Sequence, residues 1–279
     1  MKHLRFHAVT LIFLPVFLSG CATTSVFINR SCVADKIAKT AGFNKEYIEA
    51  DGFTLMTYQR FKSPLDNLRI YIEGDGRAWE TRSKLSDDPT PSNPVALKLA
   101  AVDPADNIAY IARPGQFSAL GFPGCDSKYW SGRRFATEVV EAFDKIIDIL
   151  KKKSGTKNVE LVGYSGGGAI AVLVAAARSD VVALRTVAGN LDSKEWCVYH
   201  NVNQLDDSLN PIDVAAMLTN LPQRHFVGSN DPVIPSSIAR SFVKKMGDGN
   251  DRRITTVHGV THHSGWREHW SKLLMEPLY

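Results

Sequence analysis

Short apolar runs alternate along this chain with stretches of helical spacing, and this alternation constrains the fold more than any other feature. The runs are short and apolar, as buried strands are. They lie at Leu68 to Ile72, Ile108 to Ala112, Val159 to Val162, Leu184 to Ala188, His225 to Val227 and Ile254 to Val257. Strands separated in this way predict an α/β fold, a mostly parallel central sheet with helices on both faces.

Two of the intervening helices carry clear start signals. Apolar residues repeat at helical spacing from Phe135 to Leu150, and Ser131 is the predicted cap of that helix. A second helix is expected over Ile238 to Met246, capped by Ser236 or Ser237. Both helices would cover faces of the sheet.

The composition is that of an ordinary globular protein. The 279 residues are 44% hydrophobic and contain 33 Lys and Arg against 29 Asp and Glu. Because Lys2 and Arg5 lie in the first twenty residues, 31 basic residues remain against 29 acidic ones from residue 21 onward. No basic excess indicates a nucleic-acid partner. A single domain can account for this length, and the oligomeric state stays open.

The first twenty residues read as a secretory signal peptide. A basic start precedes the apolar run Ala8 to Leu18, which is too short for a membrane-spanning helix of about 20 residues. The ending Leu18-Ser19-Gly20-Cys21 resembles the lipobox of bacterial lipoproteins. That resemblance implies cleavage before Cys21 and diacylation of its thiol. Since Ala22 is not the Asp that retains lipoproteins in the inner membrane, it also implies an outer-membrane anchor facing the periplasm.

The rest of the chain divides into a spacer and one domain. Residues 21–45 are expected to form a lipid-anchored spacer with a helix around Val33 to Ala41, and residues 46–279 the folded α/β domain. Near the start of that domain, Tyr47 to Phe61 is predicted to form two strands that turn at Asp51-Gly52.

Export would place the domain in an oxidising compartment, where its three cysteines permit one disulfide. Cys125 with Cys197 is the preferred pair, because both are expected in long loops of the core while Cys32 lies close to the tether. The sequence leaves open both the pairing and the alternative of three unpaired thiols.

The strongest chemical motif follows the strand Val159 to Val162. There Gly163-Tyr164-Ser165-Gly166-Gly167 leads into the small apolar helix Gly168 to Arg178. This is G-x-S-x-G in the strand-turn-helix setting of a nucleophile elbow. The flanking glycines leave room for a strained serine whose hydroxyl is exposed at the edge of the sheet. Ser165 is the predicted nucleophile.

The same glycine-rich segment permits a weaker interpretation, as a dinucleotide-binding site. Gly166-x-Gly168-x-x-Ala171 matches the glycine fingerprint of such sites. That fingerprint expects an acid at the end of the next strand, where this chain has Gly189-Asn190. A phosphate-binding P-loop is excluded because no Lys-Ser or Lys-Thr follows. No cofactor is therefore expected.

A serine nucleophile needs a base, and the base needs an orienting carboxylate. Asp231 follows the strand at His225 to Val227, and His262 follows the last strand, so Ser165, Asp231 and His262 stand in the chain order of a hydrolase triad. His263 is the alternative base. A metal site built on His258 with His262 and His263 is disfavoured, because no H-E-x-x-H motif accompanies them.

Acyl transfer also needs hydrogen-bond donors where negative charge develops. The strand Leu68 to Ile72 ends in Glu73-Gly74-Asp75-Gly76. Many lipases and esterases have a His-Gly turn at this place, so Glu73 is a departure from their pattern. The predicted oxyanion donors are the backbone N–H groups of Asp75 and Gly166.

Taken together, these motifs resemble the α/β-hydrolase fold superfamily, and more narrowly a group of uncharacterised bacterial α/β-hydrolase lipoproteins. The narrower likeness is carried by these segments: Tyr71-Ile72-Glu73-Gly74-Asp75-Gly76, Ala112-Arg113-Pro114, Tyr129-Trp130, Ala188-Gly189-Asn190-Leu191-Asp192 and Ser208-Leu209-Asn210-Pro211. The resemblance implies serine hydrolase chemistry but no particular substrate.

This fold usually inserts its cap in the segment Asn190 to Leu221, which is too short here for a separate lid domain. A fairly open pocket is therefore expected. Four aromatic residues are predicted either to edge it or to serve as packing residues: Trp79, Phe117, Trp130 and Trp196.

The resulting functional hypothesis is a lipid-anchored carboxylesterase that forms an acyl-enzyme on small or medium acyl substrates. Its partners would be a small ester or acyl substrate and the membrane that holds its anchor. Two alternatives stay open: a peptidase or amidase using the same triad, and a catalytically silent binding lipoprotein with a hydrolase fold.

Overall fold

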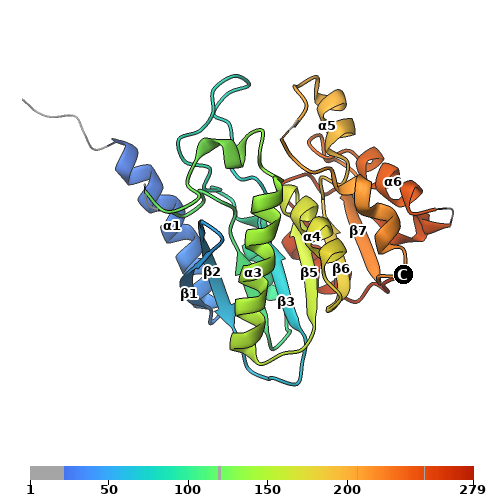
Figure 1. The fold of residues 1–279 in the computed structure, drawn as a ribbon, viewed down its shortest axis with the longest axis horizontal. Helices are drawn as coiled ribbons and strands as arrows, with labels where there is room; N and C mark the ends of the chain where they lie inside the picture. Colours follow the sequence, from blue (N-terminus) through green and yellow to red (C-terminus); the bar gives the residue numbers. More distant parts are fainter. Residues whose placement is uncertain (1–21, 119–120, 206, 248) are drawn as a thin grey trace, which may run out of the picture.

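The computed structural model describes residues 22–118, 121–205, 207–247 and 249–279. Their strands form one eight-stranded sheet in the order β1-β2-β4-β3-β5-β6-β7-β8 (Figure 1). The strands are β1 (Asn44–Ala50), β2 (Phe53–Arg60), β3 (Leu68–Ile72), β4 (Ile108–Ile111), β5 (Val159–Tyr164), β6 (Val181–Val187), β7 (Gln223–Gly228) and β8 (Ile254–Val257).

The sheet is mostly parallel, which confirms the expected α/β class. β1 pairs antiparallel with β2 and β2 antiparallel with β4, whereas every pairing from β4 across to β8 is parallel. The β1–β2 hairpin turns at Asp51-Gly52, as predicted. The chain runs from β3 to β4 on one side and then returns to β5 on the other. In open α/β sheets, ligands bind outside the carboxyl ends of the strands at such a reversal.

Helices cover both faces of this sheet. α3 and α4 lie in front of it in Figure 1, and α4 also packs on η2, which contacts α6. On the other face, α2 contacts both α1 and α7. The helical elements are α1 (Ala22–Thr40), α2 (Val95–Val102), η1 (Ser127–Trp130), α3 (Thr137–Ser154), α4 (Gly166–Ala177), α5 (Ser193–His200), η2 (Pro211–Leu218), α6 (Ser236–Lys245), η3 (Asn250–Arg253) and α7 (Trp266–Leu273).

Helix α4 is the core helix of the molecule. All of its residues from Gly166 to Ala175 are buried. Their mostly small and β-branched side chains let the helix lie close to the sheet on one side and to α3 on the other. A helix that is apolar on every side is stable only in such a setting.

Two expectations about helix caps are wrong. Ser131 ends η1 and donates its hydroxyl hydrogen bond to the Ser127 carbonyl at 2.8 Å, while α3 begins at Thr137 with Ala136 as its cap. Ser236 is the first residue inside α6, and Pro235 precedes it without a side-chain cap. In both cases a backbone turn rather than a serine hydroxyl begins the helix. The helix expected around Val33 to Ala41 is confirmed as the second half of α1, which begins earlier, at Ala22.

The signal peptide at residues 1–20 and the lipid attachment site Cys21 lie outside the described residues. Within the part of the chain that is described, no helix combines the length and the apolar character that crossing a membrane requires.

The expected Cys125–Cys197 disulfide is wrong, because no disulfide joins cysteines of the described residues. Cys197 points from α5 into the core and is completely buried. Cys125 lies in the loop before η1, next to Gly124, which packs against Phe53 of β2. The two thiols therefore belong to different parts of the fold, which the sequence order did not reveal.

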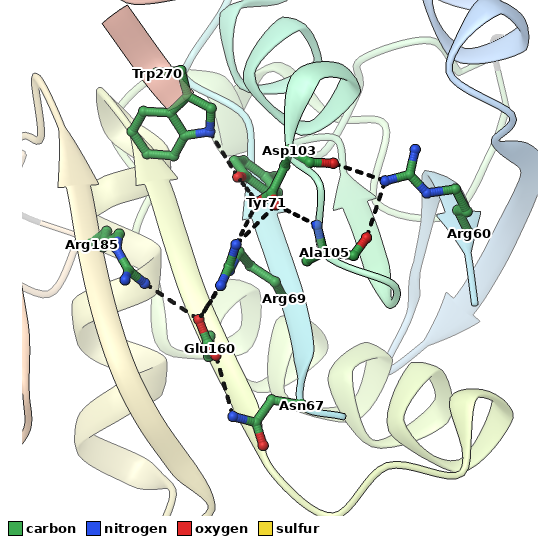
Figure 2. A network of polar contacts seen from close by, with 9 residues as sticks. All are labelled: Arg60, Asn67, Arg69, Tyr71, Asp103, Ala105, Glu160, Arg185 and Trp270. Carbon is green, nitrogen blue, oxygen red and sulfur yellow. Dashed lines mark hydrogen bonds and ion pairs between the residues drawn. The ribbon is translucent and has the colours of Figure 1, made fainter. Parts of the chain in front are cut away.

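A polar network ties the centre of the sheet to the helices on the α2 and α7 face (Figure 2). Arg69 on β3 forms ion pairs with Asp103 at 2.8 Å and with Glu160 on β5 at 2.9 Å. The Tyr71 hydroxyl donates to Asp103 and accepts a hydrogen bond from the Trp270 indole at 2.9 Å. The Asp103 side chain is completely buried. The network thus holds the β3–β5 junction, which carries the turns described next.

Candidate active site

Ser165 occupies the sharp turn between β5 and α4. Its backbone has φ 52° and ψ −122°, a strained conformation for a residue with a side chain. The glycines around it are required by close backbone contact: a Cβ on Gly163 would lie 2.3 Å from the Gly167 carbonyl oxygen, and one on Gly167 would lie 2.3 Å from that of Ile72. The G-x-S-x-G pattern therefore encodes the geometry that exposes this hydroxyl.

The loop after β8 brings His262 to this hydroxyl. His262 Nε2 lies 3.0 Å from Ser165 Oγ, and His262 Nδ1 lies 2.8 Å from Asp231 Oδ2. Because the carboxylate accepts from Nδ1–H, Nε2 is left as an acceptor for the serine hydroxyl. The structure thus brings together the three residues that the sequence placed in triad order.

A tight turn after β7 fixes the Asp231 carboxylate. Its Oδ1 accepts hydrogen bonds from the backbone N–H groups of Val233 at 2.8 Å and Ile234 at 2.9 Å. The side chain is fully buried, so these bonds and His262 replace its lost hydration. A carboxylate held in this way can orient the imidazole and stabilise its charged form.

His263, the alternative base, has a different environment. Its Nδ1 lies 3.1 Å from the Tyr164 hydroxyl, and its ring meets the His262 ring edge-on with centroids 4.8 Å apart. Burial of its imidazole lowers the pKa of His263, and the nearby His262 lowers it further. No hydrogen bond joins His263 to Ser165 among the described residues. The geometry therefore favours His262 as the base.

The turn after β3 lies directly against the start of α4. A Cβ on Gly166 would lie 2.1 Å from Asp75 Oδ1. Backbone N–H groups in the first turn of a helix lack intrahelical acceptors, and Gly166 is the first residue of α4. The backbone N–H of Asp75 makes no hydrogen bond to another residue that the structure describes. The two predicted oxyanion donors therefore come from adjacent segments beside Ser165.

Two arginines to which the sequence motifs gave no role neutralise the Asp75 side chain. Arg113 Nη1 lies 3.3 Å from Asp75 Oδ1, and Arg134 Nη1 lies 2.9 Å from Oδ2. Both arginines are buried, and burial lowers the pKa of Arg113 to about 10. A bare carboxylate here would oppose an oxyanion, so the arginines offset its charge. Only the segment Ala112-Arg113-Pro114 pointed to either residue.

Glu73, the departure from the His-Gly pattern, anchors the same turn. Its Oε1 accepts from the backbone N–H groups of Gly74 at 3.0 Å and Ala96 at 3.3 Å, and its Oε2 accepts from the Tyr110 hydroxyl at 3.2 Å. Burial raises the pKa of Glu73 to about 7. Glu73 thus connects the candidate oxyanion turn to the first turn of α2.

Solved structures share this fold. Est1E from Butyrivibrio proteoclasticus with bound ferulic acid superposes with a TM-score of 0.60 at 16% identity, covering 83% of this chain and 98% of that one. An alpha-beta serine hydrolase homologue from Coxiella burnetii gives 0.56 at 17% identity, over 82% and 93% of the chains. The chain has the α/β-hydrolase fold. A puromycin-hydrolysing peptidase from Mycobacterium tuberculosis gives 0.58 at 16% identity, over 84% of this chain but 38% of that one. No protein-family model and no curated protein sequence matches the chain.

As the resemblance implied, this α/β-hydrolase fold carries only a short segment between β6 and β7, formed by α5, a loop and η2. A pocket of about 550 Å³ contains Ser165 and His262 and is lined by Trp79 and Trp196. Phe117 and Trp130 are buried packing residues instead. The expectation that aromatic residues edge the pocket therefore holds for two of the four.

The third histidine of the disfavoured metal alternative differs in exposure from His262, which is buried. His258 is exposed just after β8. Among the described residues, no group of three or more His, Cys, Asp or Glu side chains is placed to hold a metal ion.

Proposed function

We propose that the protein is a serine hydrolase, specifically a carboxylesterase that forms an acyl-enzyme on small or medium acyl substrates. The observation that carries this proposal is the hydrogen-bonded chain from Asp231 through His262 to Ser165, with distances of 2.8 and 3.0 Å. It lies at the start of α4, where backbone N–H groups and the helix dipole favour developing negative charge.

In this mechanism, His262 Nε2 takes the proton of the Ser165 hydroxyl as Oγ bonds to the substrate carbonyl carbon. The N–H groups of Asp75 and Gly166 hold the resulting oxyanion, and Asp231 stabilises the imidazolium. His262 then gives its proton to the departing alcohol oxygen, and the acyl group stays on Ser165. Water, deprotonated by His262, attacks the acyl-enzyme, and the proton returns to Ser165 as the acid leaves.

The choice of an ester rests on the pocket and on the structural neighbours. The pocket of about 550 Å³ is open to solvent and has no lid domain among the described residues, which suits small acyl groups. One neighbour, Est1E, holds bound ferulic acid, which is a carboxylic acid. The peptidase neighbour supports an amide-cleaving enzyme as the second candidate. The rates on an ester and an amide of identical structure would separate the two.

A catalytically silent binding protein is the remaining alternative. Such a protein would have no reason to keep a strained serine in contact with a histidine that is itself held by a buried carboxylate. The strain at Ser165 costs folding free energy on the order of 1–3 kcal/mol, which catalysis would justify.

We also propose that Cys21 carries the lipid anchor and that the domain faces the periplasm from the outer membrane. The proposal rests on the apolar run and the Leu-Ser-Gly-Cys ending of residues 1–21. Metabolic labelling with a palmitate analogue should mark the wild-type protein. A Cys21→Ala variant should stay unlabelled, and labelling of that variant would contradict the assignment.

The catalytic proposal is tested with a fluorophosphonate probe and a series of p-nitrophenyl esters of increasing chain length. Wild-type protein should be labelled and should hydrolyse the shorter esters. Ser165→Ala should lose both properties, while Ser237→Ala, an exposed serine on α6, should keep both. Absence of labelling and hydrolysis in folded wild-type protein would overturn the proposal.

A further inference from the structure

The catalytic pocket continues into a second pocket of about 680 Å³. Trp79, Arg134 and Trp196 line both pockets, so these three side chains form the shared wall. The Trp196 indole is fixed by its hydrogen bond to the Val233 carbonyl at 2.9 Å, while Trp79 is 42% exposed. A ligand that reaches Ser165 can therefore extend past two aromatic rings into the second pocket.

The second pocket is positively charged. Its described lining residues include Arg82 and Arg134 but no Asp or Glu. Among the described residues, the carboxylate that pairs with Arg134 is that of Asp75, which also pairs with Arg113, so these three side chains together carry a net positive charge. Arg134 uses Nε and Nη1 in hydrogen bonds to Ser131 and Asp75, and its Nη2 makes none to a described residue. One guanidinium N–H pair is thus left for a ligand.

A second polar group in the catalytic pocket also lacks a partner. Asn190 follows β6, lines the pocket with Ser165 and is 3% exposed. Its backbone N–H donates to the Ser165 carbonyl at 3.0 Å, which fixes its position. Its side-chain Oδ1 makes no hydrogen bond to any described residue. Buried amides without partners are uncommon, and one beside a nucleophile suits a polar substrate atom.

We infer that the preferred substrate is an ester that carries an anionic end group, with the reacting carbonyl at Ser165 and the anion at Arg134 and Arg82. This inference rests on the proposed function. The chain between the two groups would pass the rings of Trp79 and Trp196. A guanidinium fork matches the oxygens of a carboxylate, and such charge-assisted hydrogen bonds are about twice as strong as neutral ones.

The test compares two p-nitrophenyl esters of equal length, the monoester of octanedioic acid and its methyl ester, with full-length protein. Wild-type protein should favour the acid by about 10-fold to 100-fold in kcat/KM, mainly through a lower KM, because the contact exists in both ground and transition states. Calorimetric binding to Ser165→Ala should show the same preference without turnover. Equal affinity of that variant for both esters would overturn the inference.

Two variants locate the preference. Arg82→Gln should reduce the preference for the acid several-fold and leave the ion pair between Arg134 and Asp75 in place. Arg134→Gln should remove the preference. Arg240→Gln, an exposed arginine on α6, is the matched control and should keep it. A preference that survives both pocket variants would place the anion elsewhere and refute the assigned site.

The outcomes also separate this inference from the proposed function. Hydrolysis of both esters with equal kcat/KM would refute the anion site and leave the esterase intact. Preferential binding of the acid by Ser165→Ala, together with no hydrolysis by wild-type protein, would refute the esterase and leave the anion site intact.

Discussion

The hydroxyl of Tyr164 donates a hydrogen bond to the backbone carbonyl of His262 at 2.9 Å. Tyr164 is the residue before the candidate nucleophile, so the strand that presents Ser165 also holds the loop that presents its base. The Trp266 indole donates to the same carbonyl at 3.0 Å. The separation between Oγ and Nε2 is therefore set by contacts made behind both side chains.

Tyr164→Phe should lower kcat by about 3-fold to 10-fold, because the loss of one hydrogen bond of about 1 kcal/mol loosens the His262 loop. Steady-state kinetics on a p-nitrophenyl ester would measure the change. Tyr199→Phe, an exposed tyrosine on α5, is the control and should behave like wild type. A loss greater than about 1,000-fold would show that Tyr164 does more than position the loop.

Asp231→Asn should lower kcat by about 10,000-fold while the protein stays folded, because an amide can still accept from Val233 and Ile234 but favours the wrong tautomer of His262. The magnitude is that known for the same change in serine proteases. Activity assays together with a thermal melt would measure both effects. Retention of a tenth of the wild-type activity would be inconsistent with the assigned role.

Substitutions of the two adjacent histidines should differ sharply in their effect on hydrolysis. His262→Ala should abolish measurable hydrolysis, because Ser165 would lose its only proton acceptor among the described residues. His263→Ala should retain activity within about 10-fold, because His263 contacts Tyr164 and the His262 ring rather than the nucleophile. The reverse order in kcat would identify His263 as the base.

Glu73 should make folding stability depend on pH. Its pKa is raised from 4.5 to about 7 in the folded protein, so its contribution is fully present below about pH 4.5 and is lost as the pH rises through 7. Relative to Glu73→Gln, the free energy of unfolding of the wild type should fall by roughly 3 kcal/mol between pH 4.5 and 8.

Urea unfolding of both proteins at several pH values would measure this difference. Subtracting the two curves removes other titrating groups such as His225, whose pKa burial lowers to about 3. Parallel curves for the wild type and Glu73→Gln would mean that folding does not raise the pKa of Glu73.

The polar network of Figure 2 predicts a large loss of stability for Arg69→Ala. The fully buried Asp103 carboxylate would lose its ion-pair partner, which typically costs about 3–5 kcal/mol. Lys62→Ala breaks an exposed pair with Asp106 at 3.6 Å and should cost at most about 1 kcal/mol. Urea unfolding at neutral pH compares the two, and similar losses would argue against a buried ion pair at Asp103.

Several features of the fold and the site were open to prediction from the sequence. Local periodicity located the strands, and the parallel arrangement then required that loops after different strands meet at one edge. For this reason Ser165, Asp231 and His262 could be nominated from their places after β5, β7 and β8. The helix caps failed because backbone turns competed successfully with serine hydroxyls near Ser131 and Ser236.

The sequence by itself determined the α/β class and the strained turn at Ser165, because both follow from residues that are neighbours in the chain. Only the tertiary structure decided that His262 rather than His263 faces the serine and that Arg113 and Arg134 neutralise Asp75. It also decided that Cys125 and Cys197 form no disulfide and that Trp130 is buried. These outcomes depend on which way side chains point once distant segments pack, and sequence spacing does not encode that direction.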